Sequence, residues 1–133
     1  MRLREGNGYP LFRNSAIEGV DTTTLDETRR QFGIHAIEER LEAAIEEYLT
    51  FYRRMGVFPP ALLYITFLHI GGFEAFISRH VRGPQTHIID RDILQLPEVL
   101  IEDFDLPPAV ILKPAIELLF SAFNFDHRIP RRS

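Results

Sequence analysis

The sequence predicts a single α+β domain: a long N-terminal helix and a C-terminal helix packed on a small, largely antiparallel sheet of three or four strands. Three observations support this fold class. Apolar residues recur at helical spacing between residues 34 and 55, two apolar runs flank Gly71-Gly72, and a second helical pattern follows Pro107-Pro108. Because the chain has 133 residues, 45% of them hydrophobic, one core of ordinary domain size is expected.

The first helix is expected to begin near Leu25. Thr24 and Glu27 form the T-x-x-E pattern of a capping box, whose side chains satisfy free amide groups at a helix start. Gly33 is a potential interruption, and Gly56 is a natural C-terminal cap. The apolar face comprises Ile34, Ile37, Leu41, Ala44, Ile45, Tyr48, Tyr52 and Met55, and packing on a sheet fits its tyrosines better than a coiled-coil seam does. The glutamates are expected on the solvated face: Glu38, Glu39, Glu42, Glu46 and Glu47.

Gly71 and Gly72 predict a tight β-hairpin, because glycine tolerates the positive φ angles that a two-residue hairpin turn requires. Such a turn would pair "ALLYITFLHI" with "FEAFISRHV", placing His69 opposite Glu74 and Phe67 opposite Phe76. We interpret His69 and Glu74 as a cross-strand polar pair; an acid-base pair would need a cleft. Both faces of the first strand are apolar, so it is expected to be covered on both sides.

The second half of the domain begins after a loop at Arg82 to Gln85. "THIID" and "EVLIEDF" are further strand candidates, and Pro97 between them predicts an irregular or edge segment. A helix should start at Asp105 to Pro108 and run to about Phe123, with a kink or restart at Pro114. Residues 24–125 would thus form the α+β domain, between a loop and short-strand segment at 1–23 and a basic tail at 126–133.

The composition narrows the function classes. A net charge of −4 disfavours broad binding to phosphates, although Arg79, Arg82 and Arg91 with the basic tail could form a local nucleic-acid patch. The lack of cysteine excludes disulfides, thiolate zinc sites and a cysteine nucleophile, and it fits a cytoplasmic protein. No apolar segment of a secretory signal follows the N-terminus. The uncharged residues 56–73 are interrupted by proline and glycine pairs, which favours a protein core over a membrane span.

Motifs of common enzymes are also missing from the sequence. The single lysine, Lys113, precedes a proline, so there is no P-loop, and neither G-x-S-x-G nor H-E-x-x-H occurs. "GNGYPL" contains only two glycines of a dinucleotide fingerprint. We therefore expect no cofactor and no catalytic residues, and a non-enzymatic role is favoured.

Six carboxylates lie between His87 and Asp105 and allow two interpretations. His87, Asp90 and Asp92, with Glu102 as an additional candidate, offer imidazole and oxygen ligands for a metal-dependent hydrolase or nuclease. His87 and Asp90 do not share a face of an ideal strand, however, so we favour aspartates that bind backbone amides or an arginine at a strand end. Glu98 and Glu102 share one side of a strand and are expected in solvent.

A family resemblance accompanies this segment. "IIDRDILQLPEVLIEDFD", followed by "LKPAIELLFSAF" and preceded by "MGVFPPALLYITFLHIGGF", resembles the region downstream of the AlbA-type (schlafen-like) DNA-binding domain in bacterial ATP-binding or regulator proteins. "YPLFRNSAI" resembles the tail of that domain, whose main part the sequence lacks, so its ATP or DNA function is not carried over. The matching residues are Asp90, Arg91, Asp92, Leu94, Pro97, Glu98, Glu102 and Asp103.

The resemblance implies a binding, dimerisation or sensing module of a nucleic-acid- or ATP-linked regulator. A homodimer is expected, because a small sheet leaves edges at which chains pair, and a regulator protein is a second expected partner. The candidate binding residues are Arg79, Arg82, Asp90, Arg91, Asp92, Glu98 and Glu102.

Overall fold

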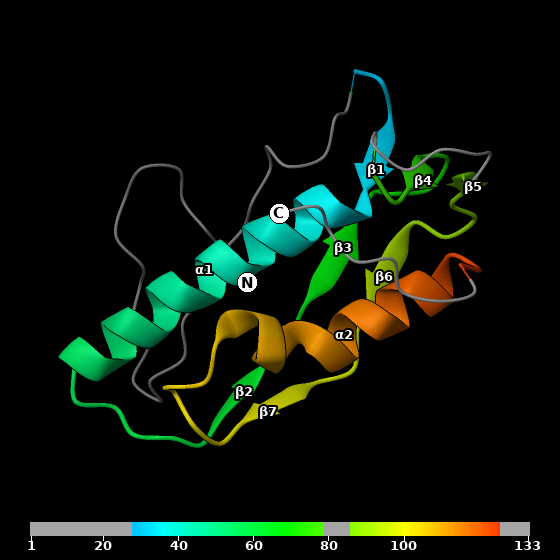
Figure 1. The fold of residues 1–133 in the computed structure, drawn as a ribbon. Helices are drawn as coiled ribbons and strands as arrows, with labels where there is room; N and C mark the ends of the chain where they lie inside the picture. The colour runs from blue at the N-terminus through cyan, green and yellow to red at the C-terminus, as the bar shows by residue number, and fades with distance from the viewer. Residues whose placement is uncertain (1–27, 79–85, 126–133) are drawn as a thin grey trace.

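The computed structural model describes residues 28–78 and 86–125, all within the predicted domain, and it confirms the α+β class. Segments 1–23 and 126–133, with their expected loop, strand and tail, lie outside the described residues. The described ranges contain helices α1 (Ile34–Arg54) and α2 (Pro108–Ala122) (Figure 1). The strands are β1 (Gln31–Gly33), β2 (Ala61–Leu63), β3 (Thr66–Leu68), β4 (Glu74–Phe76), β5 (Thr86–Ile88), β6 (Ile93–Gln95) and β7 (Val99–Ile101). In these ranges, no helix has the length and apolar character needed to cross a membrane.

The strands form small, mostly antiparallel sheets rather than the single sheet expected. Residues 61–76 run antiparallel to residues 86–101, through the pairs β2–β7, β3–β6 and β4–β5. The backbone amide of Leu96 donates to the carbonyl of Ile65 at 2.9 Å, which joins the first two pairs into one ladder. We call residues 61–68 and 93–101 the ribbon.

Pro97 produces the irregularity predicted for it. Between the pairs β2–β7 and β3–β6, the first segment of the ribbon contributes residues 64–65 and the second segment contributes residues 96–98. The second segment therefore has one extra residue, which is accommodated as a bulge. The bulge reverses the alternation of the strand: Leu94 and Leu96 are buried before it, whereas Ile101 is buried after it. Proline is tolerated here because a bulge does not need its missing amide hydrogen.

The hairpin prediction at Gly71-Gly72 was wrong. The amide of Phe73 donates to the carbonyl of Ile70 at 3.1 Å, so a turn does form, but of the two glycines only Gly72 has a positive φ, of 82°. The turn bends the chain instead of reversing it. The amides of Ile70 and Gly72 still donate to residues of the returning chain, Asp92 and Ile89, at 3.1 and 2.8 Å. Consequently Phe67 pairs with Leu94, and Phe76 with Thr86.

The helix predicted to begin near Leu25 does not continue through residues 28–33, and Leu25 itself lies outside the described residues. Thr28 to Arg30 form a turn, and β1 then pairs with β4 in parallel. Helix α1 begins at Ile34, without a side-chain cap at Gly33, and the amide of His35 donates to the carbonyl of Ile77 at 3.0 Å. The sheet thus satisfies a helix-end amide that a capping box would otherwise bind. Thr24 and Glu27 lie outside the described residues.

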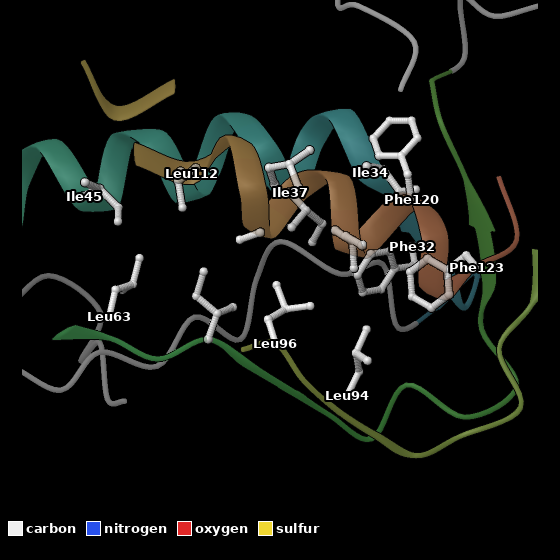
Figure 2. Packing of buried hydrophobic residues seen from close by; sticks show 14 of the residues in the cluster. Phe32, Ile34, Ile37, Ile45, Leu63, Leu94, Leu96, Leu112, Phe120 and Phe123 are labelled. Carbon is white, nitrogen blue, oxygen red and sulfur yellow. The ribbon is translucent and has the colours of Figure 1, made fainter. Parts of the chain in front are cut away.

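Both helices cover the same side of the ribbon, and the core lies between them. Figure 2 shows Leu63, Leu94 and Leu96 of the ribbon pointing toward residues of α1 and α2. Two helix predictions need correction. Glu38 is only 2% exposed, because it lies one turn beyond Ile34 on the buried side of α1. Met55 is 54% exposed, because it caps the helix after its last turn.

Helix α2 confirms its predicted limits and continues through Pro114. The N–H that proline lacks would have bonded the carbonyl of Val110, four residues earlier. Both Val110 and Pro114 are exposed, so the free carbonyl faces the solvent side of the helix. Water can therefore replace the missing partner, and the cost of the interruption stays small enough for packing to offset.

Replacing Pro114 by alanine should stabilise the domain by about 1–2 kcal/mol, because it restores a helical hydrogen bond and removes a steric conflict. The matched control is Pro108→Ala in the first turn, where proline is favoured and no gain is expected. Urea denaturation followed by circular dichroism measures both variants. A lower denaturation midpoint for Pro114→Ala would show that the proline stabilises the helix in its present form.

Candidate functional site

The side of the ribbon turned away from the helices carries the most unusual surface of the described residues. Its side chains alternate with the buried ones, as the pleat of a strand requires. The register places Leu62 beside Leu100, Thr66 beside Gln95, and Leu68 beside Ile93. Each of these pairs forms one row across the ribbon. Tyr64 and Glu98 form a fourth row, in which the hydroxyl of Tyr64 donates to a carboxylate oxygen of Glu98 at 2.9 Å. We call these eight residues the outer ribbon face.

Five large side chains of this face are about half exposed: Leu62 (52%), Tyr64 (49%), Leu68 (55%), Ile93 (59%) and Leu100 (54%). Single exposed apolar residues are common on proteins, but five such side chains on one face of a ribbon are typical of a contact surface. The sequence predicted that the first strand would be covered on both faces. The structure buries Leu63 and Ile65 on the inner face and leaves the outer face exposed.

Glu98 is the only charged residue on the outer ribbon face, and its charge acts on Tyr64. The hydrogen bond to the Glu98 carboxylate, followed by the negative charge of that carboxylate, raises the pKa of Tyr64 above its ordinary value. The phenol therefore remains a hydrogen-bond donor throughout the neutral range. Of the predicted binding residues, Glu98 is the one that the structure places on this face.

The structure separates the residues of the predicted metal site. His87 pairs with Ala75, and its ring stacks on Phe123 with centroids 6.1 Å apart. The Asp92 carboxylate lies 3.4 Å from Nδ1 of His69. Across the described ranges, no group of three or more histidine, aspartate or glutamate residues could hold a metal ion. Within the described residues, this arrangement gives no geometric support to the hydrolase hypothesis.

The remaining acidic residues lie at turns or in solvent. The carboxylate of Asp90 is 85% exposed and 4.0 Å from Nε of Arg91. Glu98, Leu100 and Glu102 are all exposed, as expected for residues on one side of a strand. Asp103 accepts a hydrogen bond from the amide of Asp105 at 2.8 Å, which makes a local turn before α2. Arg79, Arg82 and the basic tail lie outside the described residues.

These exposures change the expected effect of removing the aspartates. A buried aspartate would cost about 1–3 kcal/mol when replaced by alanine. Asp90 and Asp92 are largely exposed, so Asp90→Ala and Asp92→Ala should each change stability by less than ~1 kcal/mol. Thermal unfolding with a chelator, and then with magnesium, manganese or zinc, checks both this value and the metal hypothesis. Metal-dependent stabilisation of the wild type that both variants lose would restore the metal site.

The outer ribbon face was missed at the level of sequence, although its signal is present. Leu62, Tyr64 and Leu68 alternate with buried residues, but the partner strand changes its alternation at Pro97, which hides the matching face. Comparisons of the chain with protein-family models, curated proteins and solved structures found no match. The resemblance to the region beside an AlbA-type domain therefore remains a prediction.

Proposed function

We propose that the chain is a non-enzymatic interaction module whose contact surface is the outer ribbon face. The observation that carries the proposal is the group of five half-exposed apolar and aromatic side chains on one side of a two-stranded ribbon. A sheet with apolar residues on both faces is stable in water when both faces are covered. The helices cover one face of this ribbon, and a binding partner would cover the other.

The energetics favour such a contact. Burying the exposed half of a large apolar side chain contributes about 1 kcal/mol, so the five residues together offer about 5 kcal/mol before the costs of association. Tyr64 adds a polar tip to an aromatic body, a combination that is enriched at protein interfaces. The face carries only one formal charge, so the charge that a partner must desolvate is small.

The proposal includes two further statements: the chain forms a homodimer, and it is associated with a bacterial nucleic-acid- or ATP-linked regulator. The homodimer is supported by the exposed apolar side chains of the outer ribbon face, and the free edges of β2–β7 and β3–β6, which lack a third strand within the described residues, are a second place for two copies to pair. The regulator is supported by the resemblance of "IIDRDILQLPEVLIEDFD". A cytoplasmic location belongs to the same proposal and is supported by the lack of cysteine.

Photo-cross-linking in cells of the source organism tests the contact surface directly. A photoreactive phenylalanine analogue at position 68 should give discrete protein adducts, because Leu68 lies on the outer ribbon face. The control is the same analogue at position 117, since Glu117 is exposed on α2. Adducts at 68 and not at 117 support the proposal. The same analogue is also placed at positions 62 and 100 of the face. A lack of adducts at positions 62, 68 and 100, or equal adducts at position 117, would overturn the proposal.

A further inference from the structure

We infer that the outer ribbon face binds the same face of a second copy, with the two ribbons face to face and running in opposite directions. This inference rests on the proposed function and names the partner for that surface. The two copies would be related by a two-fold axis that crosses the strands at the middle of the face. Leu62 of one copy would then lie over Leu68 of the other.

The order of side chains along the ribbon carries this inference. The rows run from Leu62 and Leu100, through Tyr64 with Glu98 and Thr66 with Gln95, to Leu68 and Ile93. The pattern is apolar, polar, polar, apolar, which is the same from either end. A two-fold interface requires a surface that complements itself. Reversal of the second ribbon meets this requirement, because apolar rows then cover apolar rows and polar rows cover polar rows.

The two middle rows decide between reversed and unreversed ribbons. In the reversed arrangement, the large Tyr64 lies over the small Thr66, and facing large and small residues pack well. Glu98 lies over Gln95, whose amide can donate a hydrogen bond to the carboxylate. Without reversal, Tyr64 and Glu98 would face each other across the interface, although they already bond within one ribbon. The reversed arrangement uses more of the polar groups.

The area of the face is sufficient for a stable contact. Half-exposed side chains of this size offer ~100 Å² each, so the five apolar and aromatic residues supply about 500 Å². Thr66, Gln95 and Glu98 are also exposed and extend the face to roughly 800 Å² per copy. That is the area which each partner buries in an interface of standard size.

Cysteine cross-linking of the full chain tests the direction of the ribbons. The natural chain has no cysteine, so each variant carries one reactive thiol. Leu62→Cys and Leu68→Cys are prepared separately, one with an affinity tag, then mixed and treated with a bismaleimide that spans about 10 Å, the distance between stacked sheets. The mixture should give a cross-linked heterodimer. Leu62→Cys alone should not cross-link, because the two copies of position 62 would lie about 20 Å apart along the strands.

A second measurement reports association itself. Sedimentation equilibrium of the wild type should show a monomer–dimer equilibrium, and Leu68→Glu should raise the dimer dissociation constant at least ~100-fold, since both copies of the contact are lost. Leu118→Glu is the matched control, because Leu118 is exposed on α2 and should leave the constant unchanged. Circular dichroism confirms that both variants fold.

The outcomes separate this inference from the proposed function. Cross-linking of Leu62→Cys with Leu100→Cys, and not with Leu68→Cys, would replace the reversed arrangement by the unreversed one. A wild type that is monomeric at every concentration would overturn the second copy as partner. Photo-cross-links from position 68 to a different protein would in that case leave the proposed function standing, whereas their absence would overturn both.

Discussion

Replacement of Phe32 by alanine is expected to lower the free energy of unfolding by about 3–5 kcal/mol, the range for loss of a fully buried aromatic side chain. Phe32 is 0% exposed and lies in β1, a strand of only three residues. Its ring makes edge contacts with Phe67 of the ribbon and Phe123 after α2, at centroid distances of 5.1 and 5.2 Å. One side chain thus joins three parts of the fold, and the cavity left by its removal would open between them.

Urea denaturation followed by circular dichroism measures this effect, and Phe58→Ala is the matched control. Phe58 is 84% exposed, so its replacement should change stability by less than ~0.5 kcal/mol. Phe32→Leu should recover a large part of the loss, because it fills much of the cavity. Equal stability of Phe32→Ala and the wild type would mean that β1 does not lie under the ribbon and α2.

The success and failure of the sequence predictions follow the range of the interactions involved. Helix α2 was predictable because its signals are local: prolines at its start and apolar residues at helical spacing. Strand β1 has no such signal. Its three residues form a strand because Gly33 allows close approach to the ring of Phe76, to which an added Cβ would lie 3.0 Å distant, and because β4 supplies the hydrogen bonds.

The candidate site shows the same division. Alternating residues of 61–68 predicted a strand with two apolar faces, but which face stays exposed depends on where the helices pack. The bulge at Pro97 is a non-local event as well, because a bulge exists only relative to the partner strand. The acidic segment gave a misleading signal, since the pairing of β5 and β6 with different partners separates His87 from Asp92.

Gly72→Val should destabilise the domain by about 2–3 kcal/mol, because a β-branched residue is strongly disfavoured at the positive φ of 82° found there. The predicted hairpin turn required a positive φ at Gly71 as well, but Gly71 does not have one. A Cβ at Gly71 would meet Asp92 at 3.4 Å, an ordinary contact. Gly71→Val is therefore the matched control, with a smaller expected loss.

Contact with Arg30 is a second source of destabilisation at Gly72. A Cβ there would lie 3.0 Å from Nη2 of Arg30, and the same atom donates to the carbonyl of Gly71 at 2.7 Å. The guanidinium also lies 5.0 Å from the ring centroid of Phe73. A bulky residue at position 72 would displace Arg30 from both contacts, which we call the Arg30 clamp. The stability lost on Gly72→Val would therefore combine backbone strain with the loss of the Arg30 clamp.

The Arg30→Ala background separates the two causes. If backbone strain dominates, Gly72→Val will still cost about 2 kcal/mol when Arg30 has already been removed, because φ does not depend on that side chain. If the clamp dominates, the cost in that background will fall toward the value for Gly71→Val. Denaturation midpoints of the four proteins in the cycle supply the comparison. Equal midpoints for Gly72→Val and Gly71→Val in the wild-type background would contradict both the positive φ at position 72 and the close approach of Arg30, which are the two features that distinguish Gly72 from Gly71.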